Sequence, residues 1–213
     1  MKKLILTFAA LILIAAPALA DMRVSITHNF AGRFGDTSGG EFLITVLEDP
    51  IGIYAKDAQF RTFCVETDEY VSNTNYYATI NAYADKGGSG GPEPDWLDPK
   101  SAYLYSAWLD GTITNNTVNA NKVQNTIWAI ENEVGYTADV ALLAQATTEV
   151  TSGSWFSKWG ADSIGDIRVL NLWTNADHTG NAQDELVRVP VPAAIGLGVL
   201  GLALVGWLKR RVG

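Results

Sequence analysis

The chain contains a single cysteine, Cys64, within the segment RTFCVETDEYV (residues 61–71). A thiol becomes a nucleophile when it loses its proton, so this residue is the first candidate for chemistry. Three roles fit a lone cysteine: a small buried hydrophobic group, a thiol that pairs with another molecule, or a nucleophile whose partner lies elsewhere in the chain. The residues around Cys64 do not by themselves decide between these roles.

Other residue types offer little for catalysis or metal binding. The chain has two histidines, His28 and His178, and no CxxC pair, which argues against a metal site. No Walker loop is present, and no GxSxG or GxGxxG sequence stands in the strand–turn–helix setting of a nucleophile elbow or a dinucleotide-binding fold. The polar segment NADHTGNAQDE (residues 175–185) lacks EF-hand spacing and is expected to be a solvated loop. We therefore predict no metal, no cofactor and no enzyme active site, and a secreted hydrolase is the least favoured alternative.

The first twenty residues have the three parts of a secretory signal peptide. Two lysines precede the apolar residues 4–16, and small residues surround the predicted cleavage site, formed by Ala18, Ala20 and Asp21. The apolar run is too short for a comfortable membrane span. We predict that residues 1–20 are a signal peptide handled by the Sec machinery, so that the mature chain is exported.

The last 25 residues, 189–213, have the pattern of a membrane anchor. An uncharged apolar segment, residues 193–208, precedes a basic cluster of Lys209, Arg210 and Arg211. A helix of that length spans about 24 Å, slightly less than a hydrocarbon core unless flanking residues contribute. The basic cluster acts as a stop-transfer signal that stays cytoplasmic, which places the globular part outside the membrane.

The start of this segment carries a more specific motif, formed by Val189, Pro190, Val191, Pro192 and Ala193. Together with the apolar helix and basic end, it resembles the PEP-CTERM sorting signal of Gram-negative bacteria in its VPxPA form. Val191 stands where the common form has glutamate. The resemblance implies processing by an exosortase-like enzyme, membrane contact through the C-terminal helix before processing, and delivery to the cell surface or extracellular matrix.

Processing makes an already acidic chain more acidic. The full chain has a net charge of −8. Without residues 1–20, 13 basic and 23 acidic residues remain, a net charge of −10, and without the tail 10 and 23 remain, a net charge of −13. Such a body repels phosphate backbones, so we expect no nucleic acid partner.

Between the two ends, the hydrophobic pattern changes from strand-like to helical and back. Alternating apolar and polar residues predict strands over residues 22–30, 41–48, 58–71, 163–174 and 184–191. Helical spacing predicts helices over residues 100–111, 119–136 and 139–150, the second capped by Asn119 or Asn121 and closed by Gly135. A glycine- and proline-rich stretch, residues 84–99, is expected to be a flexible loop. We predict one α+β domain over residues 21–188, an antiparallel β sandwich or barrel with a helical subdomain inserted at about 99–150.

The predicted second helix contains Gln124, sixty residues after Cys64 and shortly before an Ile-Trp pair. The FCVE segment and this helix resemble bacterial surface thioester domains, which carry a [Tyr/Phe]-Cys-[Val/Ile/Leu]-[Asp/Glu] strand and a Thr-Gln-x-Ala-Ile-Trp helix. Val123 and Thr126 replace the Thr and Ala of that helix. The resemblance covers residues 55–135 and implies a cross-link between the Cys64 sulfur and the Gln124 side-chain carbonyl. The supporting motif residues are Phe63, Val65, Glu66, Ile127 and Trp128.

The chemistry of such a cross-link sets requirements on the fold. A thiolate that attacks a neutral carboxamide must expel ammonia, so the two groups have to be held together and water excluded. The thioester is an electrophile that reacts once with an incoming amine, so no turnover is implied. The expected function is covalent attachment of an exported surface or matrix protein to an amine-bearing surface protein. The alternative keeps the same fold without the bond, as a noncovalent structural component that binds an extracellular polysaccharide.

Overall fold

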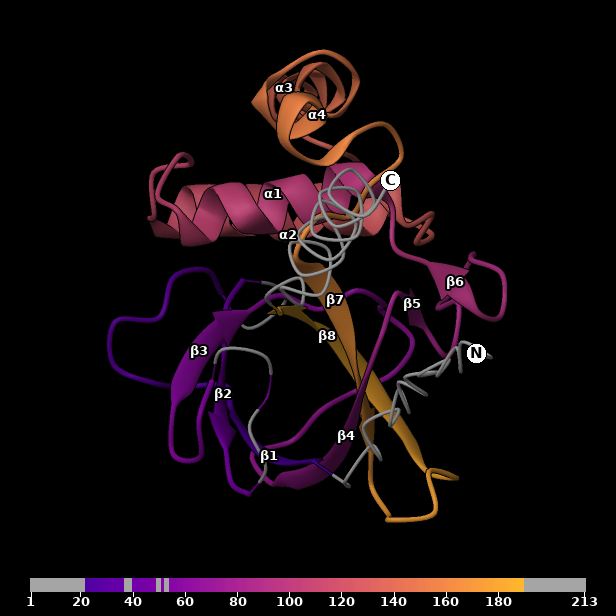
Figure 1. Ribbon diagram of the computed structural model, residues 1–213. Coiled ribbons are helices and arrows are strands. Elements are labelled where there is room, and N and C mark those ends of the chain that lie inside the picture. Colours follow the sequence, from indigo (N-terminus) through magenta and orange to yellow (C-terminus); the bar gives the residue numbers. More distant parts are fainter. Residues whose placement is uncertain (1–21, 37–39, 49–50, 52–53, 190–213) are drawn as a thin grey trace, which may run out of the picture.

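The computed structural model describes residues 22–36, 40–48, 51 and 54–189, which form eight strands and four helices (Figure 1). The chain is a mixed α/β protein with an antiparallel main sheet. The predicted signal peptide with its cleavage site, residues 190–193 of the sorting motif, the apolar segment 193–208 and the basic cluster 209–211 all lie outside these residues. Within the described part of the chain, none of the helices has the length and apolar character needed to cross a membrane.

Six strands form the main sheet in the order β3-β2-β1-β4-β7-β8, and every neighbouring pair is antiparallel. Inward-facing residues of β1 and β2 alternate with half-exposed ones, which is the pattern of a sheet with one buried face. The strand bounds are β1 Met22–Thr27, β2 Phe42–Val46, β3 Gln59–Thr62, β4 Asn75–Asn81, β7 Ile167–Trp173 and β8 Asn181–Arg188.

The chain directly after β3 lies alongside β8. The Leu186 N–H donates to the Phe63 carbonyl at 3.0 Å, and the Val65 N–H donates to the Asp184 carbonyl at 2.9 Å. These two hydrogen bonds connect the two outermost strands of the sheet order. The sheet therefore curls (Figure 1), and the side chains on its inner face form an apolar cluster.

The helices form one insertion between the sheet strands. A short hairpin, β5 (Tyr83–Ala84) and β6 (Asp95–Trp96), leads into them. The helix bounds are α1 Pro99–Leu109, α2 Thr117–Ile130, α3 Val140–Thr151 and α4 Ser154–Trp159. Helices α1 and α2 lie across one end of the curled sheet, and α3 and α4 lie beyond them (Figure 1).

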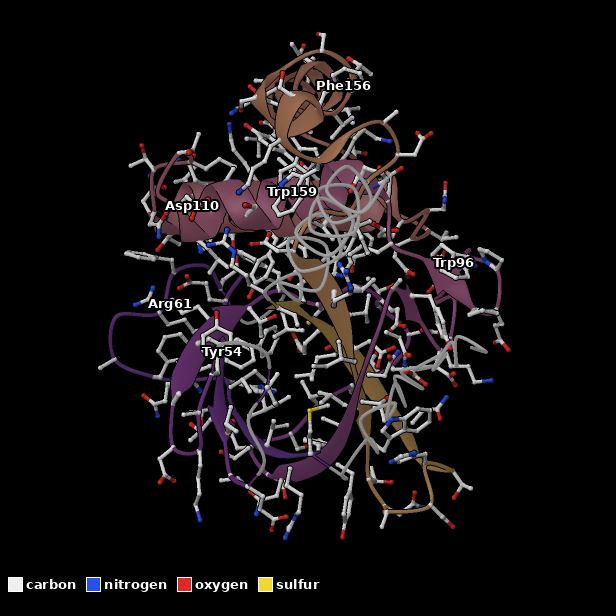
Figure 2. All side chains as sticks on the ribbon, viewed as in Figure 1. Tyr54, Arg61, Trp96, Asp110, Phe156 and Trp159 are labelled. Carbon is white, nitrogen blue, oxygen red and sulfur yellow. The ribbon has the colours of Figure 1, made fainter. Side chains whose placement is uncertain are left out.

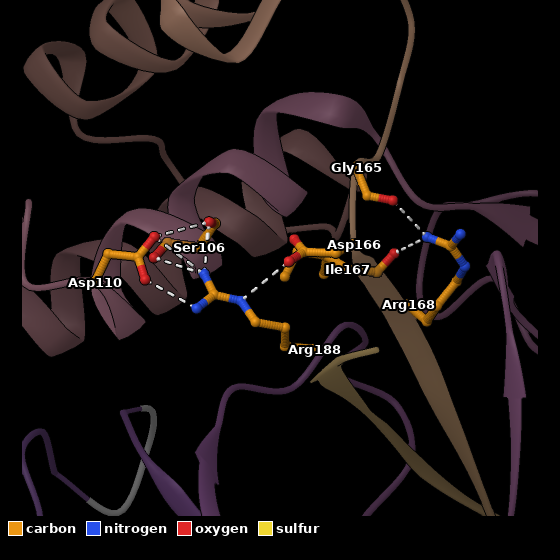
Figure 3. Close-up of polar contacts among 7 residues, drawn as sticks. All are labelled: Ser106, Asp110, Gly165, Asp166, Ile167, Arg168 and Arg188. Atoms are coloured by element: carbon orange, nitrogen blue, oxygen red, sulfur yellow. Dashed lines mark hydrogen bonds and ion pairs between the residues drawn. The ribbon is translucent and has the colours of Figure 1, made fainter. Parts of the chain in front are cut away.

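Arg188, the last residue of β8, fixes the end of α1 to the sheet. Its guanidinium donates to the Asp110 carboxylate at 2.8 Å and to the Ser106 hydroxyl at 2.7 Å (Figure 3). The same group forms an ion pair with Asp166 at 3.6 Å, just before β7. One side chain therefore joins the helical insertion to both strands that follow it.

Several of the predicted element boundaries are wrong. Helix α2 begins at Thr117 because the Asn116 side chain, rather than Asn119 or Asn121, accepts the capping hydrogen bond. It ends at Ile130 instead of continuing to Gly135, since Asn132 adopts a positive φ of 67° that a helix cannot accommodate. The strand predicted over residues 58–71 is limited to β3, because the chain leaves the β2 edge after Thr62 to pair with β8.

Several elements were not predicted. Strand β4 was missed because its segment NYYATIN mixes strand-forming residues with asparagines that are typical of turns. The β5–β6 hairpin lies at the two ends of the segment expected to be a flexible loop. Helix α4 follows α3 with a short break, so the helical insertion extends to residue 159 rather than 150.

Glu41, which is fully buried before β2, links the sheet to the helices. Its carboxylate accepts the Trp108 indole N–H at 2.8 Å and pairs with the Arg61 guanidinium at 2.7 Å. It also accepts the Phe34 backbone N–H at 3.0 Å. Because each partner comes from a different segment, removing this carboxylate leaves several polar groups unpaired at once.

We therefore expect Glu41→Ala to lower the free energy of unfolding by about 2–4 kcal/mol, because a buried N–H and a guanidinium lose their acceptor. The matched control is Glu48→Ala, which removes the exposed ion pair with Arg23 and should cost less than about 1 kcal/mol. Urea denaturation of both variants measures the difference. Equal effects of the two substitutions would contradict this role of Glu41.

Candidate functional site

Cys64 lies two residues after β3, in the segment that pairs with β8. It forms an isolated antiparallel bridge with Glu185 and is 1% exposed. Its thiol donates to the Glu185 carboxyl Oε1 across 3.5 Å. The lone cysteine is therefore a buried residue on the line where the two outer strands meet.

Gln124 lies in the middle of α2 and is fully buried. Its carboxamide oxygen accepts the Cys64 backbone N–H at 3.0 Å, and its amide nitrogen donates to the Cys64 carbonyl at 2.8 Å. The side chain thus pairs with the Cys64 peptide as a neighbouring strand would. The structure brings together the two residues singled out in the sequence, with the carboxamide against the cysteine backbone and the thiol hydrogen-bonded to Glu185.

The packing of α2 explains why Gln124 reaches this position. Val123 and Ile127 flank it on the same helix, and both are fully buried in the core between the helices and the sheet. When Val123 and Ile127 both pack into the core, Gln124, which lies on the same side of the helix, is buried with them. The carboxamide then has to satisfy its hydrogen bonds inside the protein, and the Cys64 peptide supplies both.

The supporting motif residues attach the cysteine segment to the helices. The Phe63 ring packs edge-on against Trp108, with centroids 5.4 Å apart, and Val65 is buried in the same cluster. The Trp128 indole N–H donates to the Glu66 carbonyl at 3.1 Å. Segment 63–66 is therefore held on both sides of Cys64.

Glu185 and its neighbour Asp184 were missed as site residues. The segment 175–185 was expected to be a solvated loop, but its last five residues belong to β8 and Gln183, Asp184 and Glu185 are buried. The prediction holds for residues 175–180, which form the turn between β7 and β8, and is wrong for residues 181–185. Acidic residues in a strand show their burial only when the pairing strands are known. The overlapping strand prediction over residues 184–191 was the available signal that these residues are not in a loop.

Three carboxyl groups, Glu66, Asp184 and Glu185, lie in this buried region. Burial raises the pKa of Glu185 and of Glu66 well above their ordinary values, and the charge of Asp184 adds to the rise for Glu66. Burial raises the pKa of Asp184 to about 7. Burial also raises the pKa of the Cys64 thiol, and the charge of Glu185 adds to that rise. The thiol is therefore neutral at neutral pH, and any attack by sulfur requires a group that accepts its proton.

A second candidate site is a cavity of about 490 Å³ between the β5–β6 hairpin and the end of α2. Its rim includes Trp96, which is 65% exposed and points away from the body of the protein (Figure 2). The Tyr83 ring packs against Trp96 with centroids 5.2 Å apart. The polar lining groups include Asp95, Asn132 and Asp162. This combination of an exposed aromatic ring with polar acceptors is suited to a polyhydroxylated ligand.

Glu131, at the end of α2 beside this cavity, holds a proton at neutral pH. Burial raises its pKa to about 8, and the charges of Asp98 and Asp95 add to the rise. Its carboxyl group accepts the Asp98 backbone N–H at 3.2 Å. The folded chain therefore keeps a proton that the unfolded chain releases near the ordinary glutamate pKa.

This difference predicts that stability falls as the pH rises from about 5 to about 7, because the unfolded state binds fewer protons than the folded state in that interval. Glu131→Gln removes one such proton while it keeps an acceptor for Asp98. We expect the slope of unfolding free energy against pH to lessen by about 1.4 kcal/mol per pH unit in this variant. Urea titrations at several pH values measure the slope, and identical slopes in the two proteins would refute the assignment.

Comparisons of the chain with protein-family models, with curated proteins and with solved structures give no match. The interpretation of both sites therefore depends on their geometry and chemistry. Of the two, the Cys64–Gln124 pair has the more specific arrangement, because one carboxamide bonds to both the N–H and the carbonyl of a single residue.

Proposed function

We propose that this chain is an exported cell-surface or extracellular-matrix protein that forms an internal thioester between Cys64 and Gln124. The observation that carries the proposal is the pair of hydrogen bonds, 3.0 and 2.8 Å, between the Gln124 carboxamide and the Cys64 peptide. These bonds hold the Gln124 carboxamide, which is the electrophile, against the backbone of Cys64, whose thiol is the nucleophile. Both residues are buried in a site from which water is excluded. The body of the protein is then a thioester domain.

The two hydrogen bonds have separate roles in the proposed reaction. When sulfur attacks the side-chain carbon of Gln124, negative charge develops on the carbonyl oxygen, and the Cys64 N–H already donates to that oxygen. The bond from the amide nitrogen to the Cys64 carbonyl holds the leaving group in place until it departs as ammonia. The product links the sulfur of residue 64 to the side-chain carbonyl of residue 124.

The thioester would react with an amine on a partner molecule. A lysine ε-amine that attacks the carbonyl forms an amide at position 124 and releases the Cys64 thiol. Each chain reacts once, so the protein is an adhesive component rather than an enzyme. An amine-bearing surface protein is the partner class that this chemistry selects.

The ends of the chain complete the proposal. Residues 1–20 direct export through the Sec machinery, and residues 189–213 act as a PEP-CTERM sorting signal with a transmembrane helix. The Val189 N–H donates to the Asp166 carbonyl at 2.7 Å, so the folded body extends to the first residue of the sorting motif. An exosortase-like enzyme would then cut directly beyond the domain. We describe that domain as a closed antiparallel barrel with an inserted helical subdomain, supported by the pairing of Cys64 with Glu185.

Intact-mass spectrometry of the purified chain tests the thioester. We expect a mass lower than that of the unmodified polypeptide by one ammonia, and a gain of one methylamine at Gln124 after methylamine treatment. Cys64→Ala should show neither change, because the nucleophile is absent. A wild-type mass that retains the ammonia, with no methylamine adduct, would rule out the covalent function.

A second function, noncovalent polysaccharide binding, is favoured by the exposed Trp96 beside its cavity. An aromatic face stacks on the apolar face of a sugar ring, and the carboxylates of Asp95 and Asp162 accept hydroxyl hydrogen bonds. This function needs no thioester. It would therefore persist in the Cys64→Ala variant.

Trp96→Ala should reduce polysaccharide retention in a pulldown at least about 10-fold, because the stacking surface is lost. Tyr70→Ala is the matched control, since Tyr70 is 82% exposed but does not line the cavity. If Trp96→Ala binds as well as the control, or if the wild type binds no polysaccharide, this second function is wrong.

A further inference from the structure

The thioester reaction requires a proton to leave the Cys64 thiol and a proton to reach the departing nitrogen. We propose that Glu185 performs this transfer as the acid–base residue of the site, a role that rests on the proposed function. Glu185 contacts the reacting sulfur directly, with its carboxyl Oε1 3.5 Å from Sγ. It does not belong to either sequence motif that pointed to the cysteine and the glutamine.

The position of Glu185 is fixed by the backbone rather than by a flexible loop. It lies within β8 and faces Cys64 across an antiparallel bridge. Side chains at directly opposed positions of an antiparallel pair lie on the same face of the sheet and contact each other. The flanking hydrogen bonds between the two chain segments hold this register. The carboxyl group therefore lies beside the sulfur without any conformational change.

The second oxygen of Glu185 is the unusual feature. The residue is fully buried, and its Oε2 has no hydrogen-bond partner within the described residues. In the described part of the chain no basic side chain forms an ion pair with it. A buried carboxylate without compensation is costly, whereas a protonated carboxyl is neutral and carries an O–H donor. The geometry thus fits a carboxylic acid with Oε1 accepting from the thiol and a proton on the unpaired Oε2.

A carboxylic acid in this arrangement can transfer two protons in one step. As the S–C bond to the Gln124 carbonyl forms, Oε1 takes the thiol proton. As the C–N bond breaks, Oε2 gives its proton to the nitrogen, which leaves as ammonia. Glu185 is again protonated at the end, and the overall change is thiol plus carboxamide to thioester plus ammonia. When an amine opens the thioester, Glu185 transfers the protons in the opposite direction, from the attacking nitrogen and to the departing sulfur.

The neighbouring acids do not contact the sulfur, although Glu66 Oε1 is also buried without a hydrogen-bond partner within the described residues. Glu66 Oε2 accepts the Asp184 backbone N–H at 3.0 Å. Asp184 itself accepts from the Leu172 N–H at 3.0 Å and from the Asn171 amide at 2.6 Å. No hydrogen bond joins either carboxyl to the sulfur among the described residues. Glu185 is therefore the acid that the fold assigns to the thiol.

The experiment follows repeated formation of the thioester in the folded full chain. Ammonia opens the thioester and restores the thiol and the carboxamide, and removal of the ammonia lets the bond form again. Intact mass against time gives the rate. Glu185→Gln keeps the size of the side chain and an acceptor for the thiol but cannot transfer a proton, so we expect re-formation at least about 100-fold slower than in the wild type.

Two further variants control for structural effects. Glu131→Gln removes another deeply buried carboxyl, on α2 rather than beside the sulfur, and should re-form the bond at the wild-type rate. Glu185→Asp keeps the acid but moves it by one methylene, so its rate should fall between those of the wild type and Glu185→Gln. Circular dichroism shows which variants fold. If Glu185→Gln does not fold, the rate of Glu185→Asp provides the test.

The outcomes separate this inference from the proposed function. A wild type that forms the thioester while folded Glu185→Gln forms it equally fast overturns the role of Glu185 and leaves the thioester in place. A wild type that never loses ammonia overturns both. If Glu185→Asp has to carry the test, a rate equal to that of the wild type also overturns the role of Glu185.

Discussion

The pairing of the Gln124 carboxamide with the Cys64 peptide is the interaction on which the arrangement of the site depends. A buried primary amide needs partners for its carbonyl oxygen and its N–H groups, and the Cys64 backbone supplies a donor for the oxygen and an acceptor for the nitrogen. The cysteine segment offers them because it has left the β2 edge at Thr62. The amide therefore joins helix α2 directly to the segment that carries the cysteine.

The same departure from β2 brings the chain after β3 alongside β8. One edge of the segment after Thr62 pairs with residues 184–186 of β8, and its other edge faces the Gln124 side chain. Cys64 is therefore held between helix α2 and strand β8. Each contact limits the position of the others, since a shift of register by one residue would turn the thiol to the opposite face. The position of the sulfur is thus a property of the whole fold rather than of its own segment.

Burial has opposite consequences for reactivity in this region. It excludes water, which protects a thioester from hydrolysis, but it also keeps the thiol protonated and unreactive. In the role proposed for Glu185, a neutral acid next to the sulfur would resolve this conflict because it would move protons without creating an isolated charge. Glu185 has the burial, the contact and the unpaired oxygen that such a role requires.

Much of this protein can be read from its sequence, for physical reasons that are local. The helical spacing of Val123 and Ile127 and the strand alternation of β1 and β2 depend on the order of residues along the chain. The cysteine and the glutamine could be selected because their short motifs have recognisable residue types. The burial of Glu185, the missed strand β4 and the early end of α2 could not be predicted. They depend on strand pairing, on neighbours distant in sequence and on a backbone turn at Asn132, and only the tertiary structure determines these.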